Sequence, residues 1–329
     1  MEELTLDEFV TLTPRFDEMV GRTDGVDSFC SSSHWIVPSL KAFHPDHSPW
    51  LYRSEDGLRW GAMALGHSPS VGRFVAPLES MWGLATPFIG DDEEQLAVDV
   101  AAIIAEREDE WDALWLSGLR RPSPIFDELV RTFGARYRIG LGPTTHRHVA
   151  SLEDGWEGFL SRRSSNFRRN LRRSERMAHN TGLVFEPYSG PLSPEAMLHL
   201  YERMLSVEAR SWKGRSGQGI NDGAMESFYR HMLPDLARAG RMRAVIARDP
   251  QGHDVAYVFG AVFGGTFRGL QVSFDDAYRQ MSLGNVMQAQ VIRLLCEQGV
   301  ERYDLGSDLP YKTRWAEPGL STLTLAVFP

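Results

Sequence analysis

The chain contains little cysteine and no long apolar run, and both shortages exclude classes of protein. Only Cys30 and Cys296 occur among its 329 residues. Two cysteines without a CxxC spacing do not suggest a disulfide scaffold or a cysteine-based zinc site. No apolar run reaches the roughly 18 residues that a membrane span needs, and the first residues, MEELTLDEFV, lack the basic and apolar blocks of a signal peptide. We therefore expect a cytoplasmic protein with no membrane span.

Several catalytic motifs are also missing. There is no GxSxG nucleophile elbow and no GxxxxGK[ST] phosphate loop, which argues against a serine hydrolase and an ATPase. The close histidine pairs, His44/His47 and His146/His148, have no flanking ligand set, so we expect no metal site.

Charge is distributed unevenly along the chain. The 44 acidic and 35 basic residues give a net charge of −9. Residues 1–150 hold 24 acidic and 13 basic residues, whereas residues 151–329 hold 20 and 22. An acidic protein is not built to coat nucleic acid, but its more basic half can receive a phosphorylated ligand.

Hydrophobic periodicity and turn residues predict two α+β domains, residues 1–150 and residues 151–329. The expected helices span about 5–20, 32–43, 92–107, 123–133, 164–180, 193–209, 222–239 and 283–298. The expected strands span about 49–54, 59–66, 71–77, 112–117, 135–141, 145–150, 183–187, 241–248, 254–263, 266–274, 301–305 and 321–328. Each domain should form a mixed, largely antiparallel sheet flanked by helices.

The start of the helix near residue 283 is a candidate phosphate site. Ser282 is predicted to cap this helix, which follows a strand ending near Phe274. A helix that begins after a strand presents free amides and the positive end of its dipole, which suits a pyrophosphate. Gly284 would leave the first turn open, and Arg279 and Gln280 can add donors. The alternative is a capped helix without a ligand.

The segment after the strand near 301–305 carries candidate catalytic groups. Asp304 stands at the predicted strand end, where a carboxylate can accept a proton from an ammonium. Lys312 can stabilise an oxyanion or a thiolate, and Tyr311 can protonate the thiolate. Trp315 is expected to form a wall. The alternative is an exposed loop with a surface lysine.

Two more segments are candidates for ligand binding. The glycine-rich stretch 211–219 predicts a mobile loop in which Trp212 and Lys213 line an acceptor pocket, one turn after Glu208. Seven arginines lie between residues 162 and 176. We expect a solvated helix face there; the alternatives are a site for a phosphate, for an acidic acceptor or for the acceptor end of a tRNA.

Four of these stretches together resemble the GNAT acyltransferase superfamily. They are FLSRRSSNFRRNLRRSERM (159–177), SWKGRSGQGI (211–220), SFDDAYRQMSLGNVM (273–287) and YDLGSDLPYKTRW (303–315). Their order and spacing are similar to those of CelD-like acetyltransferase domains, which are related to Fem-type aminoacyltransferases with two GNAT-like modules. The resemblance of residues 1–150 rests mainly on position. The helix start has one glycine where the superfamily usually has two.

The resemblance implies an acyl-CoA site in the C-terminal module, with residues 1–150 as a degenerate module on the acceptor side. The implied cofactor contacts are Phe274, Arg279, Gln280, Ser282, Leu283, Gly284 and Asn285. The implied catalytic residues are Asp304, Tyr311 and Lys312. The implied acceptor contacts are Glu208, Trp212, Lys213 and Trp315.

The predicted function is therefore an N-acyltransferase. It would move an acetyl or other acyl group from acyl-CoA directly to an amine on a small molecule or on a cell-envelope or secondary-metabolite precursor. One alternative is a Fem-type transferase that uses aminoacyl-tRNA, and another is an inactive binding protein with the same fold. The sequence does not specify the acceptor, the acyl length or the oligomeric state.

Overall fold

The computed structural model describes all residues, 1–329, and divides the chain into two compact units. Unit 1 comprises Met1–His146 and Leu320–Pro329, and unit 2 comprises Arg147–Gly319. The expected boundary at residue 150 thus differs from the observed one, and residues 320–329 belong to unit 1. The reason is that β13 (Glu317–Phe328) pairs with β6 (Ala113–Arg120) of that unit. None of the helices is both long and apolar enough to cross a membrane.

Unit 1 is a mixed sheet with helices. Its strands are β1 (Glu2–Leu4), β2 (Ser48–Arg53), β3 (Arg59–Ser68), β4 (Gly72–Pro77), β5 (Phe88–Gly90), β6 and the last part of β13, together with the first part of β7 (Arg138–Ser151). Its helices are α1 (Leu6–Arg22), α2 (Ser33–Phe43), α3 (Glu93–Glu106), the 3-10 turn η1 (Glu108–Glu110) and α4 (Pro124–Gly134). The strands run antiparallel from β1 to β4, then β4 pairs parallel with β6, and β6 pairs antiparallel with β13.

Local sequence determines where the first helix of unit 1 begins, and buried apolar side chains stabilise the unit. The Thr5 hydroxyl accepts the Glu8 amide while the Glu8 carboxylate accepts the Thr5 amide, which is a capping box at the start of α1. The same helix packs Phe9 and Phe16 edge-on against Trp60 of β3. A second cluster joins the buried sides of α3 and α4 to the sheet.

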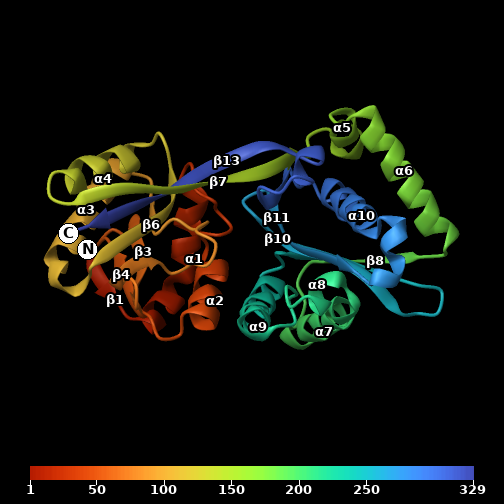
Figure 1. The fold of residues 1–329 in the computed structure, drawn as a ribbon, viewed down its shortest axis with the longest axis horizontal. Helices are drawn as coiled ribbons and strands as arrows, with labels where there is room; N and C mark the ends of the chain where they lie inside the picture. Colours follow the sequence, from red (N-terminus) through yellow and green to blue (C-terminus); the bar gives the residue numbers. More distant parts are fainter. The chain divides into compact units, whose positions relative to one another are not determined.

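Unit 2 is also a sheet with helices on both faces (Figure 1). Its strands are the last part of β7, β8 (Val184–Ser189), β9 (Met242–Arg248), β10 (Asp254–Phe263), β11 (Thr266–Phe274) and β12 (Arg302–Ser307). Its helices are α5 (Gly155–Ser161), α6 (Ser165–Asn180), α7 (Pro194–Arg210), α8 (Trp212–Arg215), α9 (Gly223–Arg238) and α10 (Leu283–Glu297), with 3-10 turns η2 (Asp276–Met281) and η3 (Lys312–Arg314).

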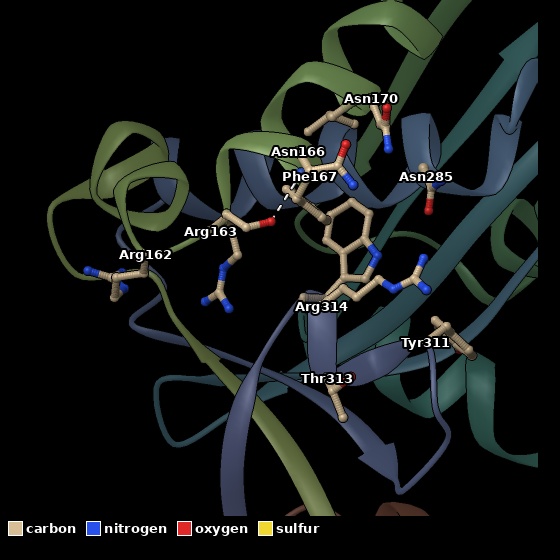
Figure 2. A pocket seen from close by; sticks show the side chains of 12 residues that line it. Arg162, Arg163, Asn166, Phe167, Asn170, Asn285, Tyr311, Thr313 and Arg314 are labelled. Atoms are coloured by element: carbon tan, nitrogen blue, oxygen red, sulfur yellow. Dashed lines mark hydrogen bonds between the residues drawn. The ribbon is translucent and has the colours of Figure 1, made fainter.

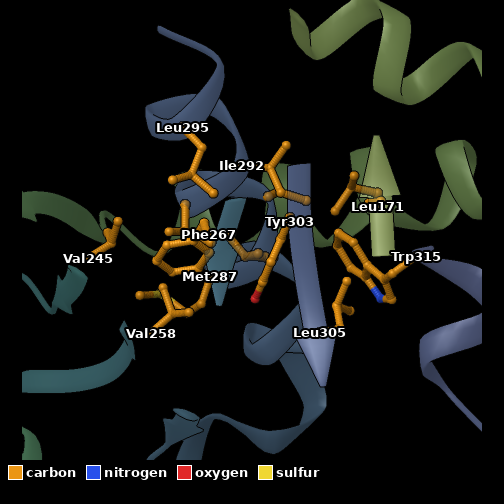
Figure 3. Close-up of a cluster of buried hydrophobic side chains, with 14 of the residues drawn as sticks. Leu171, Val245, Val258, Phe267, Met287, Ile292, Leu295, Tyr303, Leu305 and Trp315 are labelled. Atoms are coloured by element: carbon orange, nitrogen blue, oxygen red, sulfur yellow. The ribbon is translucent and has the colours of Figure 1, made fainter. Parts of the chain in front are cut away.

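The strand order of unit 2 repeats that of unit 1. The strands run antiparallel from β8 to β11, then β11 pairs parallel with β12, and β12 pairs antiparallel with β7. Helices α5, α6 and α10 lie on one face, and α7, α8 and α9 on the other (Figure 1). The core on the α10 face joins Phe267, Met287, Ile292 and Tyr303 to Leu171 of α6 (Figure 3). This core fixes α10 and α6 side by side.

The predicted α+β class, with a mixed sheet flanked by helices in each unit, is confirmed, but the strands of the two units join in one 13-stranded sheet where the predicted modules had a sheet each. The sequence analysis missed β1 and β5, which have only three residues each, and the short helices α5 and α8. The two strands expected over 135–150 form one continuous strand, β7. Such short elements and joined strands depend on pairing partners that are far away in the sequence.

The core of unit 2 yields a test of the fold. Phe267 is fully buried between the sheet and α10. Truncation in Phe267→Ala should lower the free energy of unfolding of unit 2 by about 3–5 kcal/mol, because it removes apolar contacts and leaves a cavity. Urea titration followed by tryptophan fluorescence measures the loss. The control Val184→Ala, at a side chain that is 63% exposed, should change stability by less than about 0.5 kcal/mol.

Candidate functional site

A fork between two parallel strands organises the candidate site in unit 2. Strands β11 and β12 pair only at Thr266–Arg302, Phe267–Tyr303 and Arg268–Asp304. Beyond these three pairs β11 continues to Phe274 and β12 to Ser307 without pairing to each other. Backbone groups on the facing edges of the two strands are therefore available to side chains or to a ligand.

A buried ion pair stands at the base of this fork. The Arg268 guanidinium donates to the Asp304 carboxylate at 2.5 Å, and both residues are less than 10% exposed. The other oxygen of Asp304 accepts the Gly306 amide at 2.6 Å. Gly306 has a φ of +81°, so glycine suits this turn. Asp304, expected as a proton acceptor, thus has both oxygens engaged in this structure.

Two lysines from different segments each bind one arm of the fork, where the arms are the ends of β11 and β12 that do not pair with each other. Lys312 donates to the Ser307 carbonyl of β12 at 2.6 Å, and Lys213 donates to the Val272 carbonyl of β11 at 2.8 Å. Burial, together with the nearby Arg268 charge, lowers the pKa of Lys312 to about 8. Burial also lowers the pKa of Lys213. Neither ammonium has a carboxylate within salt-bridge distance, so both remain able to bind an anion or a polarised oxygen.

Glu208 holds the segment that carries Lys213. Its carboxylate is fully buried and accepts hydrogen bonds from the Ser211 hydroxyl at 3.1 Å and the Tyr257 hydroxyl at 3.0 Å. The Ile220 amide also donates to it. Residues 212–215 form helix α8 instead of the expected mobile loop, and a Cβ on Gly214 would lie 2.1 Å from the Glu208 carbonyl. Glu208 therefore positions this segment from inside, a different place from the acceptor contact that the sequence suggested.

Exposure differs among the remaining predicted acceptor and catalytic residues. Trp212 is 52% exposed at the start of α8, and Tyr311 is 47% exposed. Partial burial raises the pKa of Tyr311, so its hydroxyl keeps its proton at neutral pH. Trp315 is buried and packs edge-on against Phe167 at 4.8 Å between ring centroids, as expected for a wall.

Helix α10 starts without a side-chain cap. Ser282 has a left-handed backbone, with φ 52°, and its side chain makes no capping bond. The prediction that Ser282 caps the helix is therefore wrong, because its left-handed conformation directs the chain from η2 into α10 instead. The Ser282 carbonyl accepts the Asn285 amide at 2.9 Å. The amides of Leu283 and Gly284 have no acceptor, but Leu283 is fully buried, so only the Gly284 amide, on a partly exposed residue, can bind an anion.

The side chains around this helix start differ from expectation. Leu283 is fully buried in the core. A Cβ on Gly284 would meet the Phe274 ring at 3.4 Å, so the Phe274 ring partly covers this glycine. Arg279 and Gln280 are exposed on η2.

A cavity of about 490 Å³ lies next to this helix start (Figure 2). Asn285 of α10 lines it on one side, and Tyr311, Arg314 and Trp315 line it on another. The start of α6 completes the wall. The residues at the cavity are Arg162, Arg163 and Ser164, which precede α6, and Asn166, Phe167, Asn170 and Leu171 of α6 itself. The cavity thus brings together Asn285, Tyr311 and Trp315 from the predicted site with a segment expected to be only a solvated face.

Arg163 is the most deeply buried cation of this cavity. It is 7% exposed and pairs with Glu317 at 2.6 Å, while its Nε has no hydrogen-bond partner. The sequence analysis did not single out Arg163, Asn166, Asn170 or Arg268. The four-residue spacing of Asn166 and Asn170 places them on one helix face, and this spacing could have indicated a shared site. The pairing of Arg268 with its partner depends on strand register, which gives no such local pattern.

Unit 1 has the same fork, but its own chain occupies it. Strands β4 and β6 pair parallel at only two positions, Phe74–Ala113 and Val75–Leu114. The segment after β4 winds around the buried Glu79 carboxylate, which accepts the amides of Trp82, Leu84 and Ala85 at 2.6–3.1 Å. A Cβ on Gly118 of β6 would lie 2.3 Å from the Ala85 carbonyl, so this segment presses directly against β6.

The buried Lys312 predicts a pH dependence of stability. Below about pH 8 the lysine is protonated in both the folded and the unfolded chain, and its burial penalty is fully present. Between about pH 8 and 10.5 the unfolded chain binds more protons, so the free energy of unfolding should rise with pH, by up to about 3 kcal/mol. Urea titrations of wild type and Lys312→Met across this range measure the difference. A difference that does not change with pH would contradict a depressed pKa.

Comparison with known proteins agrees with this architecture. Residues 165–313 match the family model described as an acetyltransferase (GNAT) domain. No curated protein sequence matches the chain. The crystal structure of FemX has a TM-score of 0.65 at 12% identity and covers 98% of this chain and 97% of its own.

Two further solved structures are similar over nearly the whole chain. A conserved protein of unknown function from Bacteroides thetaiotaomicron has a TM-score of 0.63 at 12% identity, covering 100% of this chain and 99% of its own. The C-terminal domain of a putative lysylphosphatidylglycerol synthetase from Agrobacterium fabrum has a TM-score of 0.58 at 15% identity, covering 97% and 92%. At these identities the likeness shows the fold alone, and this fold agrees with the predicted α+β architecture of two modules.

Proposed function

We propose that the chain, whose residues 165–313 match the model of the acetyltransferase (GNAT) domain, is an N-acyltransferase that takes its acyl group from acyl-CoA. The acceptor is an amine on a small molecule or on a precursor of the cell envelope or of a secondary metabolite. The reaction is direct transfer, and neither Cys30, which is buried, nor Cys296, on the side of α10, belongs to the site.

The observation that carries this proposal is the cavity beside the uncapped start of α10. The free amide of Gly284 and the side chain of Asn285 suit the pyrophosphate of an acyl-CoA. Arg163, with its unpartnered Nε, and Arg314 supply positive charge on the same cavity. The donor set thus fits a phosphorylated ligand on one face of the sheet, next to the fork.

When bound, an acyl-CoA supplies an activated carbonyl and a thiolate leaving group. Lys213 and Lys312, on opposite arms of the fork, are placed to stabilise negative charge on the carbonyl oxygen or on the departing sulfur. Tyr311 holds a proton and is placed at the cavity to give it to the thiolate. Asp304 orients Arg268 and Gly306 at the base of the fork through one hydrogen bond to each. Its carboxylate becomes a proton acceptor only when one of these two hydrogen bonds is broken.

We assign one donor site to each chain. The fork of unit 2 has free amides and a cavity beside it, whereas the fork of unit 1 is filled by the segment around Glu79. Unit 1 then acts on the acceptor side. A donor other than acyl-CoA, such as the aminoacyl-tRNA used in the Fem-type alternative, is an outcome that the following test distinguishes.

The variant Asn285→Glu tests the donor site. A carboxylate on the first turn of α10 should weaken coenzyme A binding at least about tenfold, because it places negative charge beside the proposed pyrophosphate. It should not destabilise the protein, because an acidic side chain near a helix N-terminus is favourable. Isothermal titration calorimetry with coenzyme A and acetyl-CoA gives the affinity, and thermal unfolding gives the stability.

The matched control is Gln251→Glu, the same charge change at an exposed residue between β9 and β10. It should leave coenzyme A binding within about twofold of wild type, since a distant exposed charge is screened by salt. If wild type binds no coenzyme A but binds aminoacyl-tRNA, the proposed donor is wrong and the Fem-type alternative replaces it.

A further inference from the structure

Helix α6 carries a group of arginines that have no acidic partner. Most surface arginines elsewhere pair with a carboxylate, for example Arg22, Arg131 and Arg238. In contrast, Arg169, Arg172, Arg173 and Arg176 are exposed and form no ion pair. We call these four the α6 stripe. The one acid on the helix, Glu175, is already paired with Arg293.

The geometry of α6 turns the stripe outward. With 3.6 residues per turn, the four arginines fall within a sector of about 100° on the side opposite the buried residues of α6. The buried residues are Leu171, Ser174 and Ala178. Asn166 and Asn170, which line the cavity, lie on the flank between the buried side and the stripe. The stripe therefore starts at the rim of the donor cavity and continues away from it.

A ligand confined to the cavity cannot neutralise this stripe. The cavity has its own cations, Arg162, Arg163 and Arg314. The stripe points to solvent and extends about 10 Å along the helix from its first to its last arginine. Like charges crowded on one helix face repel each other, and nothing in the structure offsets this cost. A partner larger than a cofactor, bearing negative charge, would offset it.

Resting on the proposed function, we propose that the α6 stripe docks a small acidic protein that carries the acyl thioester on a phosphopantetheine arm. The arm would enter the cavity beside Asn285 while acidic side chains of the carrier face the four arginines. Such an arm ends in the same pantetheine thioester as acyl-CoA, so one cavity accepts both. The enzyme would then accept its acyl group from such a carrier as well as from acyl-CoA, since both present it on a pantetheine thiol.

An acidic protein fits the stripe better than RNA does. Single-stranded nucleic acid is held by exposed aromatic rings interleaved with cations. The only aromatic residue of α6, Phe167, is half-buried against Trp315. In addition, the chain has a net charge of −9, most of it in residues 1–150, which opposes the binding of a long polyanion along the whole protein. A small acidic carrier would contact only the α6 stripe.

The chemistry balances without any further reactant. The amine nitrogen of the acceptor attacks the thioester carbonyl, forming a C–N bond, and the C–S bond of the arm breaks. The nitrogen loses one proton, and the departing sulfur gains one to leave a free thiol on the carrier. The products are an amide and the carrier in its thiol form.

Binding measurements test this proposal without knowledge of the acceptor. The probes are an acyl carrier protein bearing an acetylated phosphopantetheine arm, the same protein without the arm, coenzyme A and bulk tRNA. The variant with all four arginines of the stripe changed to Gln should bind the acetylated carrier about 30-fold more weakly than wild type, because four exposed charge pairs are lost. Its affinity for coenzyme A should stay within about twofold, since the stripe lies outside the cavity.

Two matched variants distinguish the effect of the stripe's charge on carrier binding from the effect of the overall net charge. Changing the same four arginines to Lys should retain most of the carrier affinity. Changing four other exposed arginines without acidic partners, Arg15, Arg121, Arg138 and Arg302, to Gln removes the same net charge and should leave carrier binding within about twofold. Thermal unfolding verifies that each variant is folded.

Five outcomes would overturn the proposal. Coenzyme A binding without carrier binding, or carrier binding that the Gln variant does not weaken, rejects the carrier and leaves the proposed function intact. Equal binding of the carrier with and without its arm rejects entry of the arm into the cavity. tRNA binding that is as tight and is lost in the same variant assigns the stripe to RNA. Absence of binding to both coenzyme A and the carrier rejects the proposed function itself.

Discussion

The early end of the parallel pairing between β11 and β12 is the constraint on which the candidate site depends. Because the strands stop pairing at Arg268 and Asp304, backbone carbonyls beyond that point need other partners. Lys213 and Lys312 supply them at Val272 and Ser307. The same divergence brings the start of α10 to the edge of a cavity, with its first amides unoccupied. The end of pairing between β11 and β12 thus creates both the ligand cavity and the polar centre around Lys213 and Lys312.

Maintaining this centre costs stability, which the apolar core of unit 2 offsets. Two ammonium groups and a guanidinium lie together in a poorly solvated region, and only Arg268 among them forms an ion pair with a carboxylate, that of Asp304. Burying unneutralised charge is unfavourable, and such arrangements are typical of binding sites rather than of structural cores. The core between the sheet, α10 and α6 is extensive enough to hold the arrangement in place. Buried Glu208, through Ser211 and Tyr257, keeps the Lys213 segment from moving away.

Sequence patterns predicted the elements of this site better than its contacts. The helix beginning near residue 283 and the strands around it follow from periodicity and turn residues, and both were found where expected. The left-handed backbone of Ser282 could not be read from a residue type that commonly caps helices. The burial of Glu208 and the Arg268–Asp304 pair arise from packing between distant segments. The position of Asn166 and Asn170 opposite Asn285 likewise depends on how α6 packs on α10.

The passage of β13 from one unit to the other has a consequence for how the chain is made. Unit 2 is formed by a continuous stretch that ends at Gly319, whereas unit 1 includes the last ten residues, Leu320–Pro329. Within these, Leu323, Leu325 and Val327 fill the core beside β6. During synthesis the first unit to leave the ribosome is therefore the last to be complete. Removal of residues 320–329 would therefore take a core strand from the amino-terminal unit and leave the carboxyl-terminal unit, Arg147–Gly319, whole.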